Sequence, residues 1–353
     1  MPERRINHWI GGKPWTGEPE RTGEVYDPAT GEVSGRVALA GVAEVDAAVA
    51  AAEQAWQTWR HVSLTRRVQI LFAFREILNT RKQELAEVIT SEHGKVVSDA
   101  LGEVTRGLEV VEFACGAPHL LKGGFSEAVS TGVDTYSIRQ PLGVVGIISP
   151  FNFPAMVPMW FFPLAIAAGN TVVLKPSEKD PSAAVLLAEM WAEAGLPDGI
   201  FNIVYGGREA VEAILAHPDI AALQFVGSTA VGRHVYQTGT ANGKRVGAYT
   251  GAKNHMVVLP DADMELAADS AVSAGFGSAG ERCMAIATVV AVGEAGDRLI
   301  PLIVERIGRL KVGPGMEPGV DMGPIYSAEH RASVIRWIEK GVAEGATLVH
   351  DGR

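Results

Sequence analysis

Residues 144–175 have the sequence VVGIISPFNFPAMVPMWFFPLAIAAGNTVVLK, in which two short runs rich in β-branched residues enclose one apolar segment. The runs VVGIIS and TVVLKP do not alternate between apolar and polar residues, which is typical of parallel strands covered on both faces. The enclosed segment is too short to span a bilayer and contains Pro158 and Pro163, so we expect a buried helix. Strand and helix recur from FNIVYG and from ALQFVGS onward. This repetition predicts an α/β fold with a parallel sheet of the dinucleotide-binding type.

The segments around this repeat predict a second, smaller α/β domain. Residues 1–40 alternate strand-like runs with turn signals, and residues 42–120 have helical periodicity. A second repeat begins near Asn254 and ends in EGATLVHDGR, which predicts one more strand. We therefore expect a dinucleotide-binding domain with an N-terminal helical region over 1–250 and a catalytic α/β domain over 251–353. The second domain is expected to be incomplete, with only its N-terminal part present, because an open α/β layer that stops there leaves a sheet edge unpaired.

Composition favours a small-molecule partner. The chain has 353 residues and a formal net charge of −10, with no run rich in Lys or Arg, so neither nucleic acid nor an anionic membrane is expected as a partner. No apolar run follows the charged start, and the two cysteines, Cys115 and Cys283, do not form a disulfide framework. A cytoplasmic location is expected. The histidines and cysteines lack metal-ligand spacing, so no metal site is expected.

Two glycine patterns have different contexts. GFGSAG at 275–280 matches G-x-G-x-x-G literally, but it ends a predicted helix instead of joining a strand to a helix, so we reject it as a dinucleotide motif. Gly227 and Gly232 do follow a predicted strand and open a helix, where backbone amides can hold a pyrophosphate. A plain turn explains these two glycines equally well.

Cys283, in GSAGERCMA, is either a packed core residue or a nucleophile. Free cysteines are commonly buried and inert. A reactive thiolate needs nearby cations or backbone amides, and Arg282 is adjacent, so we expect the arginine to favour the charged form. Cys115, in the helical FACG, is expected to be an inert packed residue.

Taken together, the motifs resemble those of the aldehyde dehydrogenase superfamily over essentially the whole chain. They occur in the order SPFNFP, VLKPSE, GLPDGIFNIVYG, FVGSTAVG, GAKNH and GSAGERCMA. GERCMA, GAKNH and RGLEVVEFACGAP at 106–118 are similar to the CoA-acylating methylmalonate-semialdehyde dehydrogenase branch. The resemblance implies a parallel-sheet NAD-binding domain, an oligomerisation hairpin near 125–141, and a homo-dimer or homo-tetramer.

The resemblance also implies site residues. Cys283 is implied as the nucleophile that forms a thiohemiacetal, with Asn152 and the Cys283 amide as oxyanion donors. Lys175 and Glu178 resemble the pair that binds the adenosine ribose, and an acidic Glu178 favours NAD over NADP. A solvated pair at a strand end is the alternative for these two. The other implied NAD contacts are Ser149, Phe151, Lys179, Gly227, Ser228, Gly232 and Thr250.

One departure from the family pattern bears on the second half-reaction. Hydrolytic members carry a glutamate where this chain has Tyr249. Water needs a base to attack a thioester, and tyrosine side chains are protonated at neutral pH, whereas a thiol such as CoA is itself strongly nucleophilic. CoA is therefore the expected co-substrate. Glu281, two residues before Cys283, is a possible substitute base, which keeps a hydrolytic enzyme as an alternative.

Arg106 and Arg282 are implied as partners for the carboxylate of methylmalonate or malonate semialdehyde, because guanidinium groups bind carboxylates in bidentate fashion. An exposed helix residue is the alternative for Arg106. The implied products are propionyl-CoA or acetyl-CoA, in valine or inositol breakdown. The family's E-x-F-G-P segment and final strand do not occur in this sequence, so we expect C-terminal truncation. An inactive NAD-binding fragment is therefore a further alternative.

Overall fold

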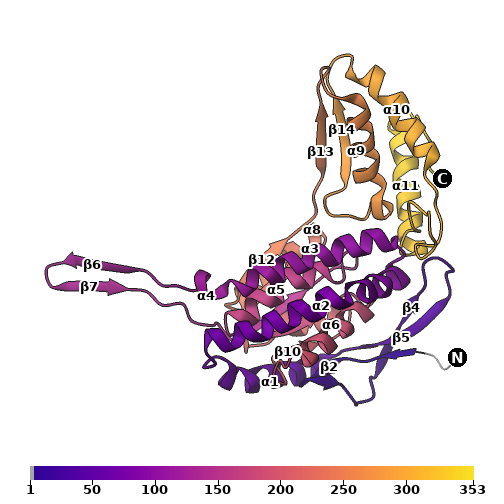
Figure 1. Ribbon diagram of the computed structural model, residues 1–353. Coiled ribbons are helices and arrows are strands. Elements are labelled where there is room, and N and C mark those ends of the chain that lie inside the picture. The colour runs from indigo at the N-terminus through magenta and orange to yellow at the C-terminus, as the bar shows by residue number, and fades with distance from the viewer. Residues whose placement is uncertain (1–3) are drawn as a thin grey trace. The chain divides into compact units, whose positions relative to one another are not determined.

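The computed structural model describes residues 4–353 and divides them into two units (Figure 1). The first unit runs from the N-terminal strands to Val25 and includes Val33–Ala86 and Leu101–Thr250. The second consists of Tyr26–Glu32, Glu87–Ala100 and Gly251–Arg353. Two short upstream segments thus pack with the C-terminal part of the chain, which a division by chain order does not anticipate.

The first unit is built on a seven-stranded sheet with the order β12-β11-β8-β9-β10-β2-β3. Its parallel strands are β8 (Val144–Ile148), β9 (Thr171–Lys175), β10 (Phe201–Ile203), β11 (Ile220–Val226) and β12 (Arg245–Tyr249). The antiparallel strands β2 (Trp9–Ile10) and β3 (Lys13–Pro14) complete one edge. Every residue of β8 and β9 is buried, as expected for strands covered on both faces. The predicted parallel α/β sheet is confirmed.

Helices cover both faces of this sheet. The helices α1 (Val42–Trp59), α7 (Arg208–Ala216) and α8 (Thr229–Ala241) share one apolar core with β8, β9 and β11. The helices α5 (Met156–Ala167) and α6 (Ser182–Glu193) pack on β8, β9 and β10. There, Phe74 from α2 (Leu64–His93) stacks on Trp191 with ring centroids 3.7 Å apart. The aromatic and aliphatic layers hold the central strands in place.

Shorter elements surround this core. A separate three-stranded sheet is formed by β1 (Arg4–Ile6), β5 (Val33–Leu39) and β4 (Arg21–Tyr26). Elsewhere, the helices α3 (Val97–Cys115) and α4 (Ala117–Leu120) precede a hairpin. The hairpin strands β6 (Phe125–Ser130) and β7 (Val133–Tyr136) are exposed at every residue. Figure 1 shows them as an arm of the first unit. A role of the arm in oligomerisation stays a prediction.

The second unit contains one βαβ repeat, which forms a small parallel sheet. The strands β13 (Asn254–Val258) and β14 (Ile286–Ala291) are parallel neighbours joined through α9 (Met264–Phe276). The helices α10 (Ala295–Arg309) and α11 (Ala328–Ala343) follow, and α10 shares an apolar core with α9 and β13. The strand expected within EGATLVHDGR is wrong, since residues 346–353 form no strand. A strand needs a partner for its backbone hydrogen bonds, and this segment pairs with none of the described strands.

Within residues 4–353, no helix combines the length and the apolar character that crossing a membrane requires.

Candidate functional site

The carboxyl ends of the parallel strands define one edge of the first unit's sheet. From β8 the chain adds β9 and β10 on one side, and it then returns to add β11 and β12 on the other side. The strand order therefore reverses between β8 and β11. Ligands of open α/β sheets bind in the crevice beyond such a reversal. The predicted residues Ser149 and Gly227 directly follow these two strands.

Ser149 and Lys175 lie side by side at this edge. The Ser149 amide donates to the Lys175 carbonyl at 3.1 Å, while the Ser149 hydroxyl is buried without a hydrogen-bond partner. The Lys175 ammonium donates to the carbonyls of Pro176 and Gly206, both at 2.8 Å, and lies 3.4 Å from a Glu178 carboxylate oxygen. Burial lowers the pKa of Lys175, and the charge of Glu178 partly opposes this shift. The lysine is therefore buried at the carboxyl end of β9, and Glu178 is partly exposed beside it. This differs from the solvated pair that was the alternative interpretation of the sequence.

Close packing requires glycine at two positions where β11 leads into α8, one in the turn and one in the first turn of the helix. A Cβ atom at Gly227 would lie 2.6 Å from the ring of Phe225, and one at Gly232 would lie 2.3 Å from a methyl carbon of Thr250. Ser228 is the N-cap residue of α8, but its side chain makes no capping hydrogen bond. The first amides of α8 could therefore hold an anionic group, since helix N-termini present unpaired N–H groups.

The SPFNFP turn leads from β8 into α5. The buried Glu103 carboxylate accepts hydrogen bonds from the amides of Ala155 and Met156, at 2.9 and 3.1 Å. A carboxylate at a helix N-terminus is favourable because it complements the helix dipole. Glu103 thereby fixes the turn that contains Phe151 and Asn152, both of which are partly buried. No local signal in the sequence marked Glu103 for this task, because it lies about fifty residues upstream of the turn.

The remaining predicted cofactor residues, Lys179, Ser228 and Thr250, are exposed. The Lys179 amide donates to the Ser177 hydroxyl at 3.0 Å, which orders the start of that loop. Next to Thr250, the exposed ring of Tyr249 stacks on Phe161 with centroids 5.8 Å apart. The structure thus gathers the cofactor candidates at one sheet edge, and their roles stay predictions.

In the second unit, Cys283 follows a strained turn. Ser278 and Ala279 adopt left-handed backbone angles, with φ of 53° and 52°. Within residues 4–353 the only other residue besides glycine with positive φ is Ala128. Left-handed backbone costs residues with a Cβ roughly 1–2 kcal/mol each, and such strain is concentrated at functional sites. The rejected motif GFGSAG is therefore a strained turn that presents an exposed cysteine.

Two contacts anchor this turn to β13. The Asn254 side-chain amide donates to the carbonyls of Cys283 and Ala285, both at 3.0 Å. Asn254 belongs to GAKNH, but no sequence signal connects it with the cysteine, because the two residues are 29 positions apart. The paired bonds fix the backbone on either side of Met284.

The electrostatic setting of Cys283 differs from the expectation. Partial burial of the thiol raises its pKa, while the amides of Cys283 and Met284 and the charge of Lys95 act in the opposite direction. The expectation that Arg282 supplies the favourable charge is wrong. Its guanidinium is instead 2.5 Å from the Asp99 carboxylate. The cation that acts on the sulfur is the buried Lys95, which is remote in sequence.

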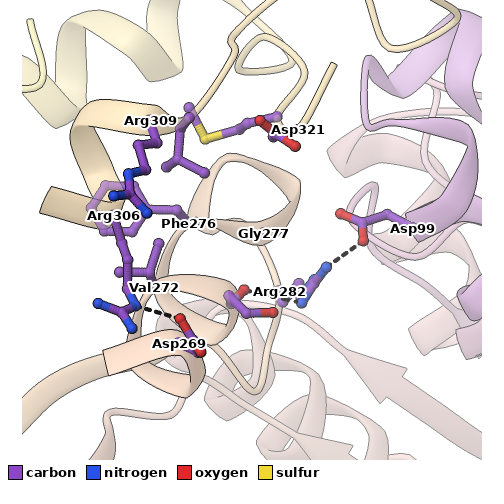
Figure 2. Close-up of a pocket in the computed structure, with 12 residues that line it drawn as sticks. Asp99, Asp269, Val272, Phe276, Gly277, Arg282, Arg306, Arg309 and Asp321 are labelled. Carbon is purple, nitrogen blue, oxygen red and sulfur yellow. Dashed lines mark hydrogen bonds and ion pairs between the residues drawn. The ribbon is translucent and has the colours of Figure 1, made fainter. Parts of the chain in front are cut away.

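Figure 2 shows Arg282 at a cavity of about 360 Å³ within the second unit. The charged groups that line it are largely paired: Arg282 contacts Asp99, and Arg306 contacts Asp269. Cys283 is not among the lining residues. The other substrate candidate, Arg106, is an exposed residue of α3 that contacts Glu109 at 3.1 Å. Both arginines are therefore engaged with carboxylates of the protein, and their role toward a substrate stays a prediction.

Glu281 is buried within a group of ionisable residues. Its carboxylate lies 3.7 Å from His93 Nε2 and 3.6 Å from His330 Nε2, and its side chain is 2% exposed. Burial raises the pKa of Glu281 to about 7, opposed by a hydrogen bond from the Tyr326 amide and by the charge of Lys95. The sequence identified Glu281 but missed the histidines and Lys95.

Comparison with known proteins identifies the family. A model of the aldehyde dehydrogenase family matches residues 15–353. The chain belongs to the aldehyde dehydrogenase family. It is therefore an oxidoreductase whose family oxidises aldehydes, which confirms the predicted enzyme class.

Individual aldehyde dehydrogenases are similar over nearly all of this chain. Malonate-semialdehyde dehydrogenase 2 of Geobacillus kaustophilus is 50% identical over 348 residues, which cover 99% of this chain and 72% of that protein. Malonate-semialdehyde dehydrogenase of Pseudomonas aeruginosa is 47% identical over 349 residues, covering 99% and 70%. A crystal structure from Sinorhizobium meliloti, described as a methylmalonate-semialdehyde dehydrogenase with NAD, has a TM-score of 0.98 at 49% identity and covers 99% and 72%. The predicted family and fold are confirmed.

Proposed function

We propose that this aldehyde dehydrogenase oxidises malonate semialdehyde or methylmalonate semialdehyde with NAD and transfers the acyl group from Cys283 to CoA. The observation that carries the proposal is the exposed cysteine after a strained turn, with the amides of Cys283 and Met284 acting on its sulfur. The names of the similar proteins support the substrate class.

The sheet edge of the first unit fits NAD. The buried Ser149 hydroxyl lacks a hydrogen-bond partner, and the Ser228 side chain makes no capping hydrogen bond to the first amides of α8. We assign the pyrophosphate to the amides at the start of α8 and the adenosine ribose to Lys175 and Glu178. The Sinorhizobium meliloti structure was solved with NAD, which supports this choice. When bound, NAD accepts the aldehyde hydrogen together with its electron pair.

Acylation begins when the Cys283 thiolate forms a bond to the aldehyde carbon and the carbonyl π electrons move to oxygen. The Cys283 amide, with Asn152 as the family resemblance implies, donates to that oxygen. When the C–H bond breaks and its electron pair leaves, the carbonyl re-forms as a thioester on Cys283. By the resemblance, the C–C bond to the carboxylate then breaks with loss of CO₂, and a proton replaces it on carbon.

The acceptor in the second half-reaction is proposed to be CoA. Its thiolate attacks the thioester carbon, the bond to the Cys283 sulfur breaks, and the enzyme thiolate is restored. Tyr249 occupies the position of the hydrolytic members' base, and its ring is stacked on Phe161. Glu281, the substitute base, is 2% exposed and is enclosed by His93 and His330, so its access to water is poor. These contacts favour the thiol over water.

Arg106 and Arg282 are proposed to bind the substrate carboxylate. Each now contacts an acidic side chain, so binding would exchange one carboxylate for another. The hairpin β6–β7 is proposed as the contact between subunits, because an exposed two-stranded hairpin is marginal in water on its own.

The test compares the two cysteines. Cys283→Ala is expected to reduce NADH formation from malonate semialdehyde by at least about a thousandfold, because no other nucleophile replaces the sulfur. Cys115→Ala is the matched control, since Cys115 is buried at the end of α3, and it should retain full activity. NADH formation is followed with and without CoA, and the product is analysed by mass spectrometry. A free acid, or equal turnover without CoA, would contradict the acyl transfer.

A further inference from the structure

Glu281 connects three separate segments of the second unit. The residue itself lies in the turn two positions before Cys283. Its carboxylate oxygens approach His93 at the end of α2, His330 in the first turn of α11, and the amide of Tyr326, which is 3.5 Å away. At 3.6–3.7 Å the carboxylate is packed against the two imidazole rings and is too far away for a standard hydrogen bond to either. Any change in the charge of Glu281 therefore acts directly on the segment that holds the cysteine.

Lys95 connects Glu281 electrostatically with Cys283. The lysine is 1% exposed, and its charge lowers the pKa of Glu281, of Cys283 and of His93. Two anions that share one buried cation compete for it, because the attraction of each for the cation is offset by its repulsion of the other. An ionised Glu281 therefore disfavours the thiolate of Cys283.

Burial makes the charge of Glu281 change near neutral pH, and several groups face its carboxylate. They are His93 from α2, Lys95 from the following segment, Tyr326 from the loop before α11, and His330 from the first turn of α11. Burial raises the pKa of Glu281 to about 7, whereas burial lowers the pKa of His93 well below its ordinary value. His93 is thus neutral when Glu281 titrates. The carboxylic acid form predominates below about pH 7, and the carboxylate predominates above it.

We propose that Glu281 is a positioning residue that holds the Cys283 turn against His93 and His330 and, through the shared Lys95, sets the pH range in which the cysteine reacts. The inference deepens the proposed function and rests on Cys283 as its nucleophile. In the acid form Glu281 leaves the charge of Lys95 to the sulfur, and in the ionised form it competes for that charge.

The experiment measures alkylation of Cys283 by iodoacetamide, with the modified peptide quantified by mass spectrometry across the neutral to alkaline range. Glu281→Gln keeps the size of the side chain and removes the charge. Its alkylation profile is expected to move to lower pH, with a rate at neutral pH higher by about three- to tenfold, the size expected for one partly screened charge. Glu294→Gln is the control, because Glu294 is exposed and its side chain makes no capping hydrogen bond.

Two further variants keep the test decisive if Glu281→Gln does not fold. Glu281→Asp retains the charge and should retain the wild-type pH profile. Lys95→Met removes the shared cation and should move the profile to higher pH, the opposite direction. A purely structural role of Glu281 would change the rate equally at every pH, so an unshifted profile in Glu281→Gln, or in Lys95→Met where Glu281→Gln does not fold, overturns the inference.

Alkylation needs neither aldehyde nor CoA, which separates this inference from the proposed function. If the profiles shift as expected while Cys283→Ala still forms NADH, the proposed function fails and the coupling of Glu281 with Cys283 stands. If Cys283→Ala is inactive and the profiles coincide, the proposed function stands and the coupling fails.

Discussion

Two glycine-containing turns of this chain have similar sequences and opposite physical characters. The turn at 227–232 follows β11 and opens α8, and its glycines are required because Phe225 and Thr250 occupy the space of a Cβ. The turn at 275–280 ends α9, and two of its left-handed positions are instead occupied by a serine and an alanine. One turn is relaxed and closely packed, whereas the other is strained.

The difference shows that a glycine pattern has meaning only with its neighbours. GFGSAG matches the dinucleotide motif letter by letter, but two of its non-glycine residues carry the unusual backbone angles. GSTAVG matches it poorly and still places helix amides at the reversal of strand order. Close packing suits a site that binds a ligand backbone to backbone, and strain suits a turn that must present one side chain.

The largest expected difference between the turns comes from adding one methyl group to each. Gly232→Ala places a Cβ against Thr250 and should lower the free energy of unfolding by about 2 kcal/mol, as overpacking typically does. It should also weaken NAD binding by at least about tenfold. Gly275 lies in α9, and a Cβ there would contact only the Ile286 carbonyl oxygen, at 3.4 Å. Gly275→Ala should therefore leave the free energy of unfolding unchanged or raise it. Urea denaturation and calorimetric titration with NAD measure the two effects.

The contrast between the two turns would be wrong if the two variants changed the free energy of unfolding in the opposite way. A destabilising Gly275→Ala together with a neutral Gly232→Ala would mean that the rejected motif is the closely packed turn. Circular dichroism of both variants checks that each retains its helices.

A smaller effect is expected from releasing the strained turn. Asn254→Ala removes the donor to the carbonyls of Cys283 and Ala285 and should cost about 1–2 kcal/mol, with slower alkylation of Cys283. Asn254→Asp should be at least as damaging, because a carboxylate cannot donate to two carbonyl oxygens. Full stability and reactivity in Asn254→Asp would contradict the anchoring role. Urea denaturation and the iodoacetamide assay provide the readouts.

The sequence predicted the first unit well because its signals are local. Runs such as TVVLK are buried on both faces, and their composition alone identifies them. The SPFNFP turn could likewise be placed from its motif, although its support by Glu103 could not, since that contact joins residues far apart in the chain.

Prediction was poorer around Cys283 because its environment is assembled from distant segments. Arg282 is its neighbour in sequence, but the side chain pairs with Asp99, 183 positions away. The effective cation, Lys95, is equally remote and had no local signal. The strand predicted near 347 failed for a related reason, since apolar residues form a strand only where another strand accepts their hydrogen bonds.

The smallest effect gives the sharpest comparison, because one substitution should have opposite signs in the two turns. Ala279→Gly relieves a left-handed alanine worth roughly 1–2 kcal/mol, and the greater freedom of glycine in the unfolded chain offsets part of this gain. We expect a net stabilisation of about 0.5–1 kcal/mol. Ala230→Gly, at an exposed position of α8, should instead destabilise by about 0.5–1 kcal/mol, because glycine is a poor helix former. Urea denaturation of both variants measures the contrast. Equal signs would show that the left-handed angles of the cysteine turn store no strain, and the turn would then hold Cys283 only through hydrogen bonds such as those from Asn254.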